Sequence, residues 1–136
     1  MAEIFKASEA ANLAIHSMAI LQLESNKAKN IKEIAHIISA STNHLAKVML
    51  KLSKAGLVKS NRGPAGGFVL NKSAADITLK EIYEAIEGRI VVSKCFFKIP
   101  SCDGKACLLG DFSERTSHLL EKMLNETKLS DIKFSL

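Results

Sequence analysis

Residues 41–70 read STNHLAKVMLKLSKAGLVKSNRGPAGGFVL, and this stretch decides the fold. Ser41 is a typical N-cap, and Gly56 stands where helices end in a left-handed residue. Between them, apolar side chains recur at the spacing of a helix that buries one face, at Leu45, Val48, Met49 and Leu52. Two strand-like runs follow, 57–60 and 67–70, on either side of the turn-rich NRGPAG. They predict a two-stranded ribbon.

A second short helix is predicted directly before this stretch, over residues 31–39. Asn30 and Glu33 form a capping-box signature, and apolar residues follow at helical spacing. Two short helices back to back, followed by a ribbon with a glycine-rich tip, are typical of a winged helix-turn-helix. A plain helix hairpin with solvated lysines would explain the two helices alone, but it leaves the ribbon unexplained.

The basic charge gathers in the same part of the chain. From Ile34 to Ala75 there is no Asp or Glu. Six basic residues lie in this window: Lys47, Lys51, Lys54, Lys59, Arg62 and Lys72. The rest of the chain holds 13 of the 19 basic residues against all 14 acidic ones, so this window carries the whole net charge of +5. Such a distribution favours a nucleic-acid-binding surface, with a solvated basic face as the alternative.

Polar side chains suited to double-stranded DNA occur at both ends of the stretch. The first turn of the helix after Ser41 offers short side chains that can hydrogen-bond bases or phosphates, and lysines follow on the face opposite the apolar stripe. Arg62 at the ribbon tip is suited to a minor groove, and glycines there let the backbone approach closely. The predicted DNA-contacting residues are Ser41, Thr42, Asn43, His44, Lys47, Lys51, Arg62 and Gly66.

Length and composition limit the remaining classes. The chain has 136 residues, 47% apolar and 24% charged, which suits a single folded domain. A buried first helix is predicted over residues 8–23, but its apolar stretch is interrupted and shorter than the ~20 residues a bilayer span needs. Its flanks, with Glu3, Lys6 and Glu9, are not the purely basic leader expected of a secretion signal. We therefore expect a cytoplasmic protein without membrane contact.

The C-terminal half predicts two further helices around a loop. Thr78 with Glu81 forms a capping box for a helix over 79–87, which Gly88 ends. Asp111 with Glu114 forms another, opening a helix to about Asn125. Its apolar positions are Phe112, Leu119, Leu120, Met123 and Leu124. So long an amphipathic helix needs a surface to cover. A second copy is the simplest, giving a homodimer on a pseudo-palindromic operator, although packing onto its own head is the alternative.

The chain thus divides into a mainly α head with a small β-wing, residues 1–88, a cysteine loop, 89–110, and a dimerisation helix with a tail, 111–136. The loop holds Cys95, Cys102 and Cys107, an odd number without the paired C-x-x-C knuckles of structural zinc. Three thiolates on an irregular loop suit an iron-sulfur cluster, and three reduced, unliganded thiols are the alternative. The histidines show no nucleophile or triad signature, so no enzyme is predicted.

These features together resemble the IscR/NsrR type of winged-helix transcription regulator. The resemblance spans essentially the whole chain and is carried by Gly56-Leu57-Val58 running into the wing, the three cysteines, and the tail Lys128-Leu129-Ser130-Asp131-Ile132. It implies a homodimeric bacterial regulator whose DNA affinity follows a two-iron or four-iron cluster sensing nitric oxide, redox or iron status. It also implies that Cys95, Cys102 and Cys107 are cluster ligands. An iron-free regulator of the same fold, sensing a metabolite, a thiol oxidant or a partner protein, is the alternative.

The fourth ligand is where this chain departs from the pattern. IscR-like members have a histidine three residues after the last cysteine, where this chain has Gly110. NsrR-like members use a carboxylate at the start of the first helix of the other subunit, which corresponds to Glu9. The resemblance therefore points to Glu9, with Asp111, Asp103 or a small exogenous ligand as alternatives. A helix N-terminal acid favoured by the dipole is the simpler role for Glu9.

Overall fold

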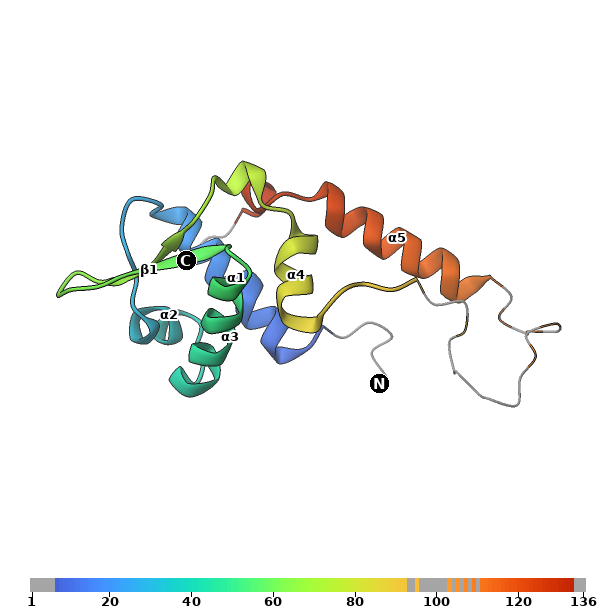
Figure 1. The fold of residues 1–136 in the computed structure, drawn as a ribbon, viewed down its shortest axis with the longest axis horizontal. Helices are drawn as coiled ribbons and strands as arrows, with labels where there is room; N and C mark the ends of the chain where they lie inside the picture. The colour runs from blue at the N-terminus through green and yellow to red at the C-terminus, as the bar shows by residue number, and fades with distance from the viewer. Residues whose placement is uncertain are drawn as a thin grey trace.

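The computed structural model describes residues 7–92, 95, 103, 105, 107, 109 and 111–133. Within these residues the elements in chain order are α1 (Glu9–Leu23), α2 (Ile31–Ile37), α3 (Thr42–Lys54), β1 (Val58–Asn61), β2 (Gly67–Leu70), α4 (Leu79–Glu87) and α5 (Phe112–Glu126). Two short 3-10 turns are η1 (Ala74–Asp76) and η2 (Leu129–Asp131). Figure 1 shows a helical head, the β1–β2 wing projecting from one end, and α5 reaching away at the other. The predicted mainly helical winged architecture is confirmed.

Most helix ends follow the predicted caps. The Oδ1 of Asn30 accepts from the Glu33 amide at 2.9 Å, and the Glu33 carboxylate accepts from the Asn30 amide at 2.7 Å. Thr78 and Glu81 form the same reciprocal pair at the start of α4. The predicted helix over 31–39 is two residues too long, because Ser39 adopts a φ of 52° that an α-helix cannot contain.

The predicted capping box at Asp111 is wrong. Asp111 is the N-cap residue of α5, but its side chain makes no capping hydrogen bond. Its backbone, at φ −88° and ψ 9°, lacks the extended conformation that turns a cap side chain back onto the helix amides. The carboxylate lies instead 4.0 Å from the Nε of Arg115, one turn along the exposed side of the helix.

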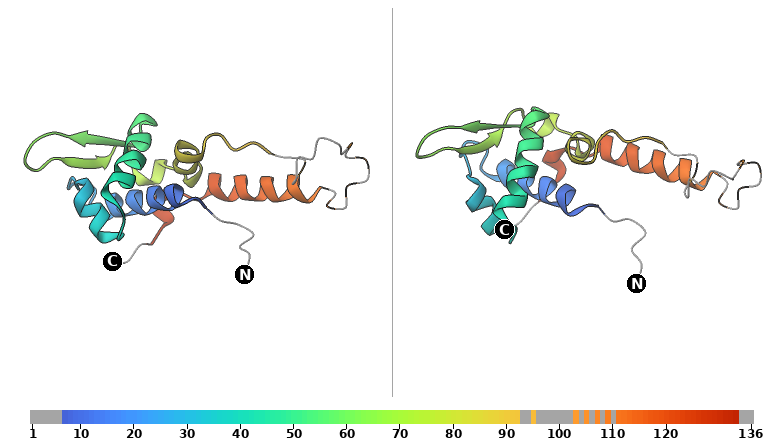
Figure 2. Two further views of the ribbon diagram at one scale, coloured as in Figure 1. Left: turned by 90° about the horizontal axis from the view of Figure 1, so that it is seen from below. Right: turned by 60° about the horizontal axis from the view of Figure 1, so that its bottom comes forward.

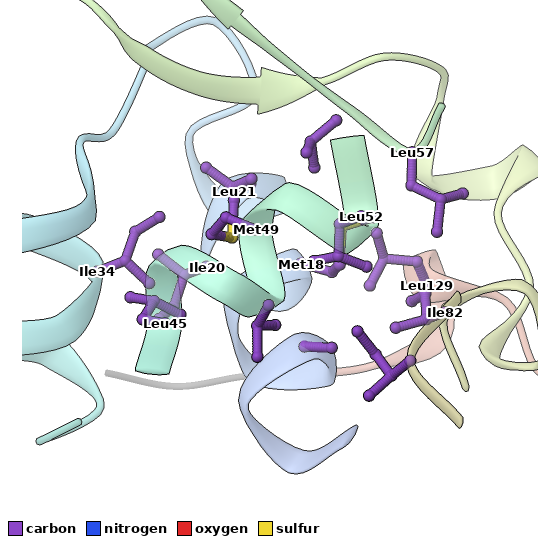
Figure 3. Packing of buried hydrophobic residues seen from close by; sticks show 14 of the residues in the cluster. Met18, Ile20, Leu21, Ile34, Leu45, Met49, Leu52, Leu57, Ile82 and Leu129 are labelled. Atoms are coloured by element: carbon purple, nitrogen blue, oxygen red, sulfur yellow. The ribbon is translucent and has the colours of Figure 1, made fainter. Parts of the chain in front are cut away.

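A continuous apolar core holds the head together, with α1 at its centre. Figure 3 shows side chains of α1 interleaved with those of α2, α3 and α4. The largest fully buried side chains include Met18, Ile34, Met49 and Ile82, one from each of these helices. Burying each removes its apolar surface from water, worth on the order of 2 kcal/mol. The four helices therefore form one body that sets the direction in which α3 faces solvent.

The wing is anchored to the segment that precedes α2. β1 and β2 pair antiparallel from Val58–Leu70 to Asn61–Gly67. Phe68 of β2 also exchanges two backbone hydrogen bonds with Lys29, at 2.8 and 3.1 Å. This extra bridge fixes the ribbon against the head instead of leaving a hairpin held at one end.

The residues after α5 return to the head. The amide of Leu129 donates to the Ile77 carbonyl at 2.8 Å, and the amide of Leu79 donates to the Thr127 carbonyl at 2.9 Å. Leu129 itself is fully buried in the core. The C-terminal end of α5 is therefore joined to the head at the start of α4, while its N-terminal end projects outward, as both views in Figure 2 show.

A salt bridge also joins α5 to α4. The Lys80 ammonium on α4 lies 2.6 Å from the Glu121 carboxylate on α5. The hydrogen bond and the charge of Lys80 hold the pKa of Glu121 below its usual value, and the same hydrogen bond raises the pKa of Lys80. Both groups keep their charge at neutral pH and tie the two helices together.

Candidate nucleic-acid interface and cysteine segment

Helix α3 has the two faces that the sequence predicts. Its apolar stripe is buried against the head at Leu45, Val48, Met49 and Leu52. Ser41, Thr42 and Asn43 are exposed at its N-terminal end, with the Ser41 hydroxyl oxygen accepting from the His44 amide at 3.4 Å. The exposed N-terminal turn leaves hydroxyl and amide groups available for hydrogen bonds to a ligand outside the head.

His44 is held by a contact that the sequence did not reveal. Its Nδ1 lies 3.5 Å from the Glu9 carboxylate at the start of α1, and the Glu9 side chain is 79% exposed. The two residues are 35 positions apart, so only the packing of α1 against α3 brings them together. An open groove of about 440 Å³ lies beside them, lined by Glu9, Asn12, Leu13, His16, Ile37 and Ile38.

The three lysines of α3 have different surroundings, although the sequence groups them on one face. Lys47 and Lys54 are exposed and make no hydrogen bond or ion pair with any described residue. Lys51 is also exposed, but its ammonium donates to the Ile86 carbonyl in the last turn of α4 at 3.0 Å. On the cationic face, the ammonium groups of Lys47 and Lys54 therefore have no partner among the described residues, whereas that of Lys51 already has an acceptor.

Leu50 is an α3 surface residue that the sequence analysis missed. It is 54% exposed and lies between Lys47 and Lys54 along the same helix. The helical spacing could have identified Leu50 as a surface residue, because position 50 falls outside the buried stripe. An apolar side chain on a polar helix face can contact a thymine methyl group or the apolar part of a sugar in a DNA groove.

The wing presents Arg62 and depends on two close backbone approaches. Arg62 is exposed directly after β1. A Cβ at Gly66 would lie 2.5 Å from the Asn61 carbonyl oxygen, and one at Gly67 would lie 2.5 Å from the Lys29 carbonyl carbon. Gly66 therefore closes the turn, and Gly67 lets the wing pack on the head. An open groove of about 530 Å³ lies on the surface where the wing meets the start of α2.

Two further basic residues near the wing are engaged by carboxylates. Lys72 lies 2.5 Å from Glu81 on α4, and Lys29 pairs with Glu24 after α1. Their charges are largely neutralised locally. Within residues 34–75, the positive surface that remains for an anionic partner lies along α3 and the wing, at Lys47, Lys54, Lys59 and Arg62.

The three cysteines among the predicted cluster ligands lie on the segment between α4 and α5, and Glu9 is the first residue of α1. Cys95 is half-buried and Cys107 exposed, while Cys102 and Gly110 lie outside the described residues. Asp103 is exposed and accepts from the Lys105 amide at 3.0 Å. In the part of the chain that the structure describes, no three His, Cys, Asp or Glu side chains are grouped closely enough to hold a metal ion. The assignment of Cys95, Cys102 and Cys107 as ligands therefore stays a prediction, because Cys102 is not among the described residues.

One side of α5 remains uncovered. Leu119 is 70% exposed, and Met123 and Phe112 are each about half exposed, whereas Leu124 is buried against the head. An open groove of about 850 Å³ runs along this side between Phe112 and Lys122. The sequence left open whether the chain's own head covers the apolar side of this helix, and the described head does not cover Leu119 or Met123.

The sequence profile of the Rrf2 family, described as iron-dependent transcriptional regulator, matches residues 7–133. The chain belongs to this family. The predicted resemblance is thereby confirmed, and so is the DNA-binding, non-enzymatic role of a transcriptional regulator. None of the helices among the described residues is long and apolar enough to cross a bilayer.

Named relatives and solved structures agree with this Rrf2 assignment. The HTH-type transcriptional regulator IscR of Vibrio atlanticus is 29% identical over 120 residues, covering 88% of this chain and 69% of that protein. The structure of CymR, the global cysteine regulator of B. subtilis, matches with a TM-score of 0.78 at 26% identity, covering 94% of this chain and 95% of that one. The structure of T. potens IscR matches with a TM-score of 0.75 at 25% identity, covering 94% of this chain and 85% of that one.

Proposed function

We propose that this Rrf2-family regulator is a homodimer whose sequence-specific DNA affinity is controlled by an iron-sulfur cluster on the cysteine segment. The observation that carries the proposal is the position of that segment. It connects α4, whose last turn contacts α3, to the exposed helix α5. A change in the geometry of the segment would therefore act on both the DNA-facing helix and the face available to a second copy.

Sequence-specific binding is assigned to the N-terminal half of α3 in the major groove, with Ser41, Thr42, Asn43, His44 and Lys47 as the contacts. Arg62 and Gly66 of the wing are assigned to the adjacent minor groove. The exposure of Arg62 and of Lys47 supports this assignment. Arg62→Ala should weaken binding to a selected operator by roughly tenfold, a loss near 1.4 kcal/mol. Unchanged operator affinity would exclude the minor-groove contact.

The second copy is assigned to the exposed side of α5. Leu119, Met123 and Phe112 present exposed apolar surface, and α5 projects from the head. Leu119→Glu should convert the dimer to folded monomer in analytical ultracentrifugation. Asn125→Glu, at an exposed polar position of the same helix, is the matched control and should leave the dimer intact. Equal sedimentation of both variants and the wild type would refute this interface.

The donor chemistry of the segment fits a cluster. Cys95, Cys102 and Cys107 supply thiolate sulfur, the ligand that iron-sulfur clusters use most, and the exposure of Cys107 is compatible with ligation at the surface. The highly exposed Glu9 carboxylate is accessible to the segment of a second copy, which supports Glu9 of the partner subunit as the fourth ligand. When bound, such a cluster supplies a redox-active centre.

Anaerobic purification followed by absorption spectroscopy and iron and sulfide quantitation tests the proposal. We expect a brown protein with sulfide-to-iron charge-transfer absorption that nitric oxide or oxygen bleaches, together with a change in DNA affinity. Glu9→Ala should make the colour more labile, and an unchanged decay rate would remove Glu9 from the ligand set. Colourless, iron-free protein after reconstitution with iron and sulfide would refute cluster control.

The second candidate is an iron-free regulator whose thiols respond to oxidation. The exposed Cys107 favours it, as does the structural similarity to CymR, the global cysteine regulator of B. subtilis. Treatment with peroxide, with thiol labelling read by mass spectrometry, separates the two candidates. A change of DNA affinity in iron-free protein that Cys107→Ser abolishes would favour thiol sensing over a cluster.

A further inference from the structure

We propose that Lys51 is a positioning residue that joins the DNA-facing helix α3 to the C-terminal end of α4, and that it does not neutralise a DNA phosphate. The pattern of lysines along α3 predicts the opposite role, a DNA contact. The proposal rests on the family's DNA binding and requires no bound cluster.

The first support is the acceptor that Lys51 uses. The last carbonyls of a helix have no amide partner within it, and they carry the negative end of the helix dipole. In a continued helix the amide of Ile90 would donate to the Ile86 carbonyl, but it donates instead to the Glu84 carboxylate at 2.9 Å. The ammonium of Lys51, 3.0 Å from that carbonyl, takes the place of the missing donor.

The second support is the location of this contact. Ile86 is buried, so its carbonyl belongs to the part of α4 that packs in the core. The next residue, Glu87, is hydrogen-bonded to the hydroxyl of Ser8, the N-cap of α1. The start of α1 and the last turn of α3 are therefore both hydrogen-bonded to the end of α4, at the adjacent residues Glu87 and Ile86. A lysine at this junction contributes to the angle between α3 and the rest of the head.

The third support is where the chain goes next. Gly88 ends α4 with a φ of 86°, and the segment that carries Cys95 starts there. Eight residues separate Ile86, the acceptor of Lys51, from Cys95. A displacement at the end of α4 would reach α3 through this hydrogen bond.

The experiment compares Lys51→Met with Lys47→Met in the full-length protein. Methionine retains the length and apolar stem of lysine but removes the charge and the donors. Binding is measured against salt concentration, on a duplex that the wild type has selected from random DNA and on a random duplex of equal length. Each phosphate neutralised by a protein cation contributes about −0.9 to the slope of log affinity against log salt.

We expect Lys47→Met to reduce the steepness of that slope by about 0.9 on both duplexes. Lys51→Met should leave the slope unchanged but lower the preference for the selected duplex by about tenfold, the scale of one charged hydrogen bond. Lys51→Arg, which retains a donor for the carbonyl, should restore much of that preference. Circular dichroism at the assay temperature shows that each variant is folded.

Hydrogen exchange gives a second readout. Amides of residues 88–92 should exchange faster in Lys51→Met than in the wild type, and Lys47→Met should not change them. A slope that becomes less steep in Lys51→Met by the same amount as in Lys47→Met would overturn the proposal, because Lys51 would then contact a phosphate. An unchanged duplex preference in Lys51→Met would overturn it as well, and either result would leave the proposed cluster control untouched.

Discussion

Replacing Gly67 with alanine should detach the wing from the head. Gly67 has a φ of 155°, and an added Cβ would lie 2.5 to 2.8 Å from three backbone atoms of Lys29 and Asn30. No side-chain rotation relieves contacts with backbone, so the strand must move away. The move breaks the two hydrogen bonds between Lys29 and Phe68, at 2.8 and 3.1 Å.

The expected loss of stability is the sum of the lost hydrogen bonds and the backbone strain. Two backbone hydrogen bonds contribute about 2 kcal/mol net, and an alanine held at this φ adds about 1–3 kcal/mol of strain. We therefore expect Gly67→Ala to lower the free energy of unfolding by about 3–5 kcal/mol. For a chain of this size each kcal/mol shifts the melting temperature by about 3–4 °C, so the midpoint should fall by at least about 10 °C.

The assay is thermal unfolding followed by circular dichroism, with Gly63→Ala as the matched control. Gly63 also has a positive φ, 114°, but no atom lies within 4 Å of its added Cβ, so this variant carries the backbone strain alone. It should lose about 1–2 kcal/mol. Protein concentrations must be equal, because dimer formation would shift the midpoint. Equal losses in the two variants would refute the steric argument and the role of the Lys29 bridge.

Three further predictions concern stability. Leu129→Ala should lower the free energy of unfolding by about 2–5 kcal/mol in a urea titration, because Leu129 is fully buried; a loss below about 1 kcal/mol would show that the tail is not part of the core. Asn30→Ala should cost about 1 kcal/mol for its lost cap, whereas Asp111→Ala, which removes no capping hydrogen bond, should cost less than about 0.5 kcal/mol; equal losses would contradict the cap assignment. The pKa of Glu121 in the folded chain lies below its usual 4.5, so its pairing with Lys80 stabilises the fold above about pH 5 and is lost as the pH falls through the folded value. Glu121→Gln should therefore flatten the loss of stability between pH 5 and 3 in denaturant titrations, and an unchanged pH profile would contradict the pairing.

Helix and strand positions were predictable where the deciding contacts are local. The caps at Asn30, Ser41 and Thr78 act within three residues of themselves, so their residue types identify the helix starts directly. Gly56 and Gly88 likewise adopt the positive φ that ends a helix. The failure at Asp111 has the same physical basis, because a cap also needs an extended backbone, and residue type alone does not determine that conformation.

The candidate site was predictable in part. The spacing of the buried stripe assigned Lys47 correctly to the outer face of α3, and the glycine-rich turn placed Arg62 at the end of β1. The same spacing treated Lys51 as equivalent to Lys47 and passed over Leu50. Helical periodicity indicates the direction in which a side chain leaves its own helix. It does not indicate whether a carbonyl of another helix, such as that of Ile86, lies in that direction.

The amino-acid sequence was thus sufficient for the winged helical fold, the basic surface and the family, because these depend on periodicity, caps and the distribution of charge along the chain. The tertiary structure alone decided which groups from distant positions meet: Lys51 with Ile86, Glu9 with His44, and Leu129 with the core of the head. Each of these contacts joins residues at least 35 positions apart, or buries a tail in a core built from earlier helices. Their partners are chosen by how α1, α3 and α4 pack, a property of the whole apolar core that no short stretch of sequence contains.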